Sequence, residues 1–288
     1  MEAIEAGVEQ PAGQPFGLGV LSHSHQVKHK TALKGRHILA IQDTTEINYQ
    51  AHANRVSGLG TVGNGKDVGF FLHPMLAVDA ADGACLGFAA VHHWLRTKKA
   101  DPNYHKQPIE EKESYRWLDT ATQAKATLSE ADRITIIADR ESDIYEEWVR
   151  IPDSKTDIIT RASRDRVLAG GVRLFKHVAN LPVDSTYSFD VAARSGKRSA
   201  HTAKLEIRFS EITIQKPQKC SDKSAADSVT LYVVDVKELA ESVIGKEEPI
   251  HWCLLTTHKV TTREEALQIV TWYCLRWNIE QLFRTLKK

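Results

Sequence analysis

Two aspartates each follow a short apolar segment and could together hold a divalent metal ion. Asp43 comes directly after residues 38–42, and Asp139 comes directly after residues 134–138. Hard divalent cations prefer oxygen ligands, and an aspartate buried at the end of a strand without a partner is energetically costly. The two positions therefore predict a metal site, although each aspartate alone could equally cap the turn or helix that follows it.

The last segment of the chain carries four polar side chains at helical spacing, namely Tyr273, Arg276, Glu280 and Lys287. On a helix that turns about 100° per residue, these side chains fall within roughly 60° of arc. A phenol, a guanidinium, a carboxylate and an ammonium on one face suit a phosphodiester held at a metal ion. The spacing alone leaves a second interpretation open, in which Arg276 and Glu280 form an ion pair on a solvated helix face.

The overall composition is that of an ordinary globular protein with no general affinity for nucleic acid. The chain has 288 residues, a hydrophobic fraction of 42% and a formal net charge of +1. Any basic surface must therefore be local, and one segment offers it, because residues 161–208 contain ten Lys or Arg against four Asp or Glu. The four cysteines show no CxxC spacing, which argues against a zinc ribbon or a disulfide framework.

The N-terminal segment shows no export signal, and a run of histidines is its one unusual feature. The acidic start of the chain lacks the apolar core of a signal peptide, and no apolar run reaches the roughly 18 residues of a membrane span. We therefore expect a cytoplasmic protein. His23, His25 and His29 could bind a metal ion, but no acidic or cysteine partner adjoins them, so a histidine-bearing loop is the simpler interpretation.

The elements that must position these residues alternate between strands and helices. Strands are predicted at residues 36–43, 69–80, 84–94, 133–138, 156–162, 185–192, 203–215, 228–237 and 251–257. Helices are predicted at residues 110–128 and 142–149, and a capping box of Thr262 and Glu265 predicts a long helix from there to the chain end. Residues 51–67, rich in Gly and Asn, are predicted to form a long loop. This order predicts a mixed α/β sheet flanked by helices, with a mostly β insertion before the last helix.

Three motifs in the same order resemble those of bacterial DDE transposases of the IS-four group. Residues 273–287 match the Y-x2-R-x3-E-x6-K signature of that group. Gln42-Asp43-Thr44-Thr45 resembles its first aspartate motif, and Asp139-Arg140-Glu141-Ser142-Asp143 resembles its second. The resemblance covers about residues 37–288, and three ordered motifs are far more specific than any one of them.

The resemblance implies an RNase H-like fold and a division of the chain. Residues 37–164 would form the first part of the catalytic core, residues 165–250 the β insertion, and residues 251–288 the last strand and the signature helix. Residues 1–36 would be a remnant or a linker. Only 42 residues precede Asp43, and the chain stops one residue past Lys287, so the resemblance implies a core that lacks the family's DNA-binding and dimerisation regions.

The resemblance also implies an activity and assigns roles to residues. It implies cut-and-paste transposition of double-stranded DNA by a homodimer, with a DNA hairpin as intermediate. The implied cofactor is Mg²⁺ or Mn²⁺, with two ions at the site. Asp43, Asp139 and Glu280 would be the catalytic metal ligands. The predicted DNA-binding residues are Tyr273, Arg276, Lys287, Arg161 and Trp252, the last of which would stack on a flipped base.

Several alternatives stay open on the sequence alone. Trp252 could be a core residue at a strand start, and Arg161 could form a surface ion pair. Glu141 and Asp143 are expected to support the site rather than to bind metal. A glycosidase with a carboxylate pair is a different class of enzyme that would work in EDTA. A remnant that binds DNA without cleaving it is a third possibility.

Overall fold

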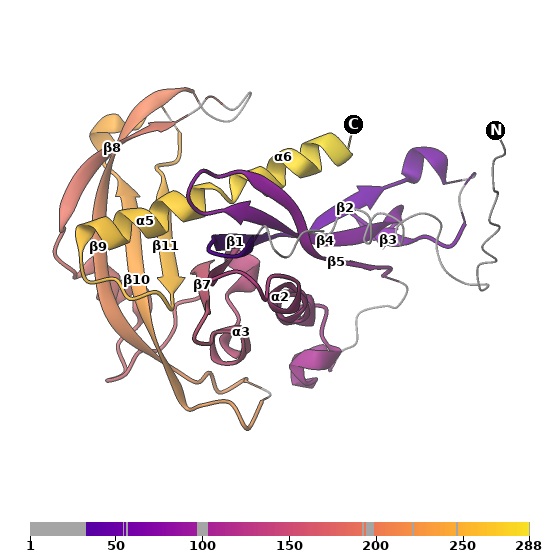
Figure 1. Ribbon diagram of the computed structural model, residues 1–288, viewed down its shortest axis with the longest axis horizontal. Coiled ribbons are helices and arrows are strands. Elements are labelled where there is room, and N and C mark those ends of the chain that lie inside the picture. Colours follow the sequence, from indigo (N-terminus) through magenta and orange to yellow (C-terminus); the bar gives the residue numbers. More distant parts are fainter. Residues whose placement is uncertain are drawn as a thin grey trace.

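The computed structural model describes residues 33–96 except 54 and 56, and residues 103–287 except 192, 194–198, 221 and 246. One mixed sheet runs through this part of the chain, and helices pack on it (Figure 1). Its strands are β1 (His37–Gln42), β2 (Thr45–Asn48), β3 (Gly60–Val62), β4 (Asp67–Asp79), β5 (Cys85–Trp94), β6 (Arg133–Ala138), β7 (Thr156–Arg161), β8 (Ser185–Val191), β9 (His201–Gln215), β10 (Ser228–Glu238) and β11 (His251–Thr256). The α-helices are α2 (Tyr115–Thr127), α3 (Tyr145–Arg150), α4 (Leu174–Ala179), α5 (Arg263–Cys274) and α6 (Trp277–Leu286). Five short 3₁₀ helices among the described residues are η2 (Gln50–His52), η3 (Tyr104–Lys106), η4 (Ile109–Glu111), η5 (Arg140–Ser142) and η6 (Ala240–Ser242).

The strand order confirms the predicted mixed α/β class with an RNase H-like sheet. The main path is β2-β4-β1-β6-β7-β11-β10-β9-β8, with β3 and β5 paired to β4. The central strands β1, β6 and β7 are parallel to one another, and β4 runs antiparallel to β1. Because parallel strands end at the same edge of a sheet, the segments after β1, β6 and β7 are brought together.

The sheet separates two apolar cores, and alternation along each strand decides which residue faces which core. Ile38 and Ala40 of β1 pack with α2 and α3, whereas Leu39 and Ile41 pack with α5 and α6. Figure 1 shows α2 and α3 on one side of β1 and the α5–α6 segment on the other. Burial of both faces explains why β1, β6 and β7 are nearly continuous apolar runs, as central parallel strands usually are.

The segment from 165 to 250 extends this sheet instead of forming a separate one. It contains β8, β9, β10 and the helix α4, which the sequence did not predict. The next strand, β11, pairs antiparallel with both β10 and β7 and so joins this segment to the central strands. The predicted mostly β character of the segment is therefore confirmed, while the exact domain boundaries stay a prediction.

Two local predictions were wrong. Residues 51–67 do not form one long loop, because β3 pairs with β4 within them. The predicted single helix after Thr262 begins with the expected capping box but breaks after Cys274. At the break, the amides of Leu275 and Arg276 donate to carbonyls three residues back, so the chain makes a tighter 3₁₀-type turn before α6.

None of the helices in the described part of the chain has the length and apolar character to cross a bilayer.

Candidate active site

The register of the sheet brings the two predicted aspartates side by side. β1 and β6 are parallel, and Ile41 pairs with Ile137. Continuing that register by two residues places Asp43 opposite Asp139, just beyond the two strand ends. The same alternation that turns Ile41 and Ile137 toward the α5–α6 core turns both carboxylates to that face of the sheet.

Arg276 joins the first aspartate to the predicted glutamate. Its Nη1 lies 3.2 Å from Asp43 Oδ2, and its Nη2 lies 2.6 Å from Glu280 Oε1. All three side chains are mostly shielded, with exposed fractions of 18% for Arg276, 17% for Asp43 and 24% for Glu280. The tight turn between α5 and α6 supplies Arg276, and the first turn of α6 supplies Glu280. The guanidinium therefore lies between two of the three predicted ligands.

Asp43 is the most electrostatically strained group of the site. Burial and, to a smaller extent, the nearby charge of Asp139 together raise the pKa of Asp43 to about 7, because a second carboxylate disfavours ionisation. Arg276 and the backbone amide of Thr44 lower the pKa again but do not offset the burial. A divalent cation between the two aspartates would relieve both effects.

The residues present fit a divalent metal ion, but they do not form a ready-made cage. Their side chains offer carboxylate oxygens, the ligands that Mg²⁺ and Mn²⁺ prefer. A cation, Arg276, already bridges two of them, which shows that the site accepts positive charge. Among the residues that the structure describes, however, no group of three His, Cys, Asp or Glu side chains converges closely enough to hold a metal. Asp43, Asp139 and Glu280 therefore remain the predicted ligands.

Three further predicted DNA-binding residues lie next to one another beside Arg276. Burial raises the pKa of Tyr273, and its ring lies 5.9 Å below the guanidinium of Arg276. Trp252, half-buried at the start of β11, packs edge-on against Tyr273 with ring centres 5.8 Å apart. Arg161, the last residue of β7, donates from Nη2 to the carbonyl of His251 at 2.6 Å. The structure thus brings Tyr273, Arg276, Arg161 and Trp252 to one end of the sheet.

Lys287 lies apart from this group. It is exposed and follows the last residue of α6, where its backbone amide donates to the carbonyl of Phe283. Tyr273, Arg276 and Glu280 of the predicted stripe contact one another in turn, although a tight turn at Arg276 divides the predicted single helix.

Both aspartates also make the local hydrogen bonds that the capping interpretation expects. Asp139 Oδ1 accepts from the amide of Glu141 at 2.9 Å and so caps the 3₁₀ turn η5. Asp43 Oδ1 accepts from the amide of Thr44 at 2.7 Å. Each of these bonds uses only Oδ1, and Oδ2 of Asp43 binds Arg276 instead, so capping and metal binding are compatible.

Glu141 and Asp143 are engaged with protein groups in this structure. Glu141 is exposed and pairs with Arg116 at 2.7 Å. Asp143 is buried and accepts from the backbone amides of Ser163 and Arg164 and from the guanidinium of Arg166. Asp143 therefore ties the segment after β7 to the segment after β6, and both segments border the site.

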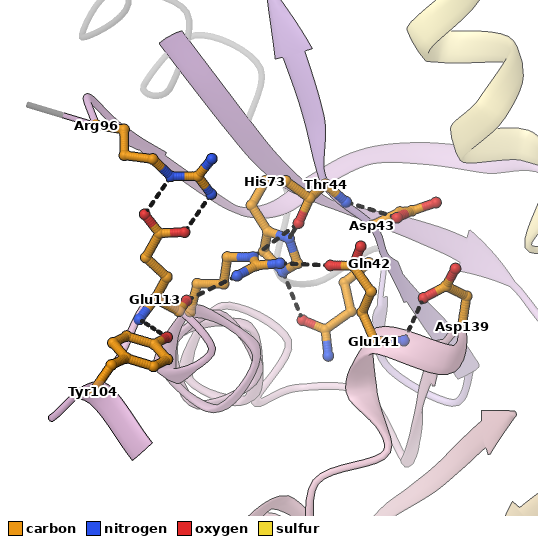
Figure 2. A network of polar contacts seen from close by, with 10 residues as sticks. Gln42, Asp43, Thr44, His73, Arg96, Tyr104, Glu113, Asp139 and Glu141 are labelled. Atoms are coloured by element: carbon orange, nitrogen blue, oxygen red, sulfur yellow. Dashed lines mark hydrogen bonds and ion pairs between the residues drawn. The ribbon is translucent and has the colours of Figure 1, made fainter. Parts of the chain in front are cut away.

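A buried polar network behind the aspartates was not foreseen from the sequence. Arg116 Nε donates to Thr44 Oγ1 at 2.9 Å, and Thr44 Oγ1 lies 2.8 Å from His73 Nδ1. His73 Nε2 in turn lies 3.1 Å from Gln42 Oε1. Figure 2 shows Gln42, Thr44 and His73 of this network near Asp43 and Asp139. One signal was available, since His73 is a polar residue inside an otherwise apolar strand.

The predicted histidine run at His23, His25 and His29 lies outside the described residues.

Comparison with known protein families shows the family to which the chain belongs. The model of a family described as "Transposase DDE domain" matches residues 90–288, more than half of the chain. The chain belongs to this transposase family. The matched segment of this DDE transposase includes Asp139, Tyr273, Arg276 and Glu280, and it begins after Asp43. Membership argues against the glycosidase alternative.

One solved structure resembles this transposase domain only loosely. It is the cryo-EM structure of the piggyBac transposase synaptic complex with hairpin DNA, matched with a TM-score of 0.39 and 10% sequence identity. The match covers 88% of this chain and 40% of that chain, so this chain spans less than half the length of the piggyBac protein in that complex.

Proposed function

We propose that the chain is a transposase catalytic domain that cleaves DNA at a metal site formed by Asp43, Asp139 and Glu280 and then joins the freed end to target DNA. One observation carries the proposal, namely that Arg276 binds Asp43 and Glu280 while Asp139 acts electrostatically on Asp43. The strand register supports it, because it brings Asp43 and Asp139 from distant parts of the chain side by side. Membership of the DDE transposase family supports it as well.

The three carboxylates would hold two Mg²⁺ or Mn²⁺ ions. These ions would activate a water molecule and would stabilise the entering and leaving oxygens of an in-line displacement. Arg276 would leave Asp43 and Glu280 when the site is loaded, and its planar guanidinium would then donate to a phosphate oxygen. The divalent ions would then neutralise the carboxylates that Arg276 had paired with, and Arg276 would pair with the phosphate instead.

The remaining side chains would hold the DNA. Arg161 and the hydroxyl of Tyr273 lie next to each other near Arg276 and would contact the phosphates next to the cleaved bond. Lys287, exposed beyond α6, would contact the backbone farther along. Trp252 would offer its ring to a base flipped out during hairpin formation.

The finer identity of the protein is part of the same proposal. The three sequence motifs favour a bacterial transposase of the IS-four group, acting on the nucleoid in the cytoplasm. Transposition requires two DNA ends to be brought together, which favours a homodimer at work. A bandshift with a labelled transposon end, read for one or two protein copies per complex, would test this part.

Single substitutions of the carboxylates test the main proposal. We expect Asp43→Asn, Asp139→Asn and Glu280→Gln each to lower Mn²⁺-dependent nicking of a supercoiled plasmid by at least about 100-fold. The loss of metal-based stabilisation amounts to several kcal/mol, and about 1.4 kcal/mol corresponds to a tenfold change in rate.

Glu141→Gln is the matched control, because Glu141 is a carboxylate two residues from Asp139 that pairs with Arg116. This variant should nick DNA within a few-fold of the parent. Near-parental nicking by any one of the three ligand variants, with folding verified by circular dichroism, would remove that residue from the ligand set.

A remnant that binds DNA without cleaving it is the second candidate. It is favoured by one observation, that no three metal-binding side chains converge in the described part of the chain. DNA binding that survives Asp43→Asn, together with parental protein that shows no Mn²⁺-dependent nicking, would decide for the remnant.

A further inference from the structure

A fully buried carboxylate, that of Glu147 in α3, joins the last residue of β1 to the segment that follows β6. Gln42 Nε2 donates to Glu147 Oε1 at 3.1 Å, and the hydroxyl of Ser142 donates to Glu147 Oε2. Gln42 directly precedes Asp43, and Ser142 ends the 3₁₀ turn that Asp139 caps. Glu147 thus contacts one close sequence neighbour of each predicted metal-binding aspartate.

The alternation of the strand explains why Glu147 supports the aspartates without touching them. Asp43 points to the α5–α6 face, so its neighbour Gln42 points to the opposite face, where α2 and α3 pack. Gln42, His73 and Glu147 are completely buried there. The carboxylate of Glu147 therefore lies behind the site, on the far side of the sheet from Arg276 and Glu280.

The hydrogen bonds of this layer are consistent with a continuous chain of donors and acceptors. Arg116 donates to Thr44 Oγ1, which leaves the Thr44 hydroxyl free to donate to His73 Nδ1. A neutral His73 with its proton on Nε2 then donates to Gln42 Oε1, and burial lowers the pKa of His73 well below its usual value, which favours the neutral form. Gln42 finally donates from Nε2 to Glu147. Each donor meets an acceptor, so the side chain of Gln42 is held in one orientation.

Burying Glu147 at this position costs more free energy than burying an apolar side chain would. Both its hydrogen-bonding partners are neutral, and burial raises its pKa to about 8. An apolar side chain of similar size usually packs in such a place at lower cost. The two aspartates, by contrast, lie one residue past their strands, where the ladder of the sheet no longer fixes their positions.

We propose that Glu147 is a positioning residue that holds the segments of Asp43 and Asp139 at the separation a divalent metal ion requires. The inference rests on the proposed function, since it concerns the metal site of that function. Residues that orient metal ligands typically contribute about 10- to 100-fold to metal affinity.

The test is the dissociation constant for Mn²⁺, measured by isothermal titration calorimetry on the full chain without DNA. We expect Glu147→Leu to raise the Kd by about 10-fold or more, because Gln42 and Ser142 lose their common acceptor. Glu147→Gln should stay near the parental Kd, since its amide can accept from Gln42 and donate to the hydroxyl of Ser142. Ser142→Ala removes one of the two hydrogen bonds with little change in volume, and a smaller rise in Kd is expected even if Glu147→Leu folds poorly.

Glu146→Leu is the matched control. Glu146 is the adjacent buried carboxylate of α3, and its recorded partner is Cys220 Sγ, away from both aspartates. This variant should leave the Kd unchanged. Parental Kd values for both Ser142→Ala and folded Glu147→Leu would overturn the inference while Asp43-dependent binding in the parent keeps the proposed function. Parental protein that shows no Mn²⁺ binding sensitive to Asp43→Asn would overturn the proposed function and this inference with it.

Discussion

The two ends of the central strands β1, β6 and β7 differ in whether their polar groups repel or satisfy one another. Past their C-terminal ends, Asp43 and Asp139 repel each other, and Arg276 bridges Asp43 to Glu280. In the N-terminal halves of the same strands and just after β11, imidazole and hydroxyl groups satisfy one another. Thr135 Oγ1 lies 2.8 Å from Nε2 of His37 and 2.8 Å from Nε2 of His258.

The difference separates a region that stabilises the fold from a region that performs chemistry. Trp272 of α5 covers both imidazoles, with ring centres 4.7 Å from His37 and 5.2 Å from His258. The two imidazoles and the hydroxyl of Thr135 satisfy one another without a ligand. The aspartate end keeps like charges together, a cost that structures usually accept where a substrate or a cation completes the site. Substitutions at the two ends should therefore have opposite effects on stability and activity.

The largest stability effect should come from acidifying the histidine end. Burial lowers the pKa of His258 to about 4, with Asp157 acting to raise it and Arg133 and His37 acting to lower it. Because the folded pKa lies below the unfolded value of about 6.5, the unfolded chain takes up the proton first as the pH falls. This contribution to stability is complete above pH 6.5 and shrinks by roughly 3 kcal/mol as the pH falls to about 4.

Urea unfolding of the parent and of His258→Gln at several pH values measures this contribution. The variant lacks the titrating group but keeps an amide that can reach Thr135, so its stability should fall less steeply between pH 6.5 and 4. Parallel curves for the two proteins would show that His258 does not control acid stability.

A smaller loss should follow from Thr135→Val. The substitution keeps the volume but removes the hydroxyl that serves both imidazoles, which should cost on the order of 2 kcal/mol. For a domain of this size we expect a fall in Tm of about 5 °C in a thermal melt. Mn²⁺-dependent nicking per folded molecule should remain parental, because Thr135 lies away from the predicted ligands. Loss of nicking in folded Thr135→Val would break the division between the two ends.

The smallest effect has the opposite sign and belongs to the aspartate end. In EDTA, Asp139→Asn should raise the free energy of unfolding by up to about 1 kcal/mol, since it removes a charge that repels Asp43. The amide oxygen can still accept from Glu141, so the cap of η5 is retained. Asp132→Asn, at an exposed aspartate just before β6, is the control and should change stability by less than about 0.5 kcal/mol. Equal shifts for both variants would mean that the aspartates do not repel each other appreciably.

Local patterns were sufficient to predict the strands that carry the site. The buried strand before Asp139 was predicted with its observed bounds, and β1, β4, β5 and β7 within one or two residues. These strands are apolar runs bounded by polar or glycine residues, and Asp82-Gly83 between β4 and β5 forms the expected turn, with a positive φ at Gly83. The capping box before α5 was likewise readable, because Thr262 and Glu265 interact within one helical turn.

Other features depended on contacts that no local pattern contains. β3 forms because β4 offers it an edge, and α4 is a short helix set within a β segment. The break between α5 and α6 contains no Pro or Gly from which it could have been predicted. The buried layer of Arg116, His73 and Glu147 joins residues from β4, α2 and α3, so its members become neighbours only when the sheet and its helices pack.

The sequence by itself determined the chemical types at the site and their order along the chain, since Asp43, Asp139, Arg276 and Glu280 were recognisable from their motifs. Tertiary structure alone decided their relations. The parallel register of β1 and β6 sets Asp43 beside Asp139, and the turn before α6 sends Arg276 between Asp43 and Glu280. The physical reason is that motif spacing describes one element at a time, whereas charge, burial and hydrogen bonding at this site arise between elements distant in the chain.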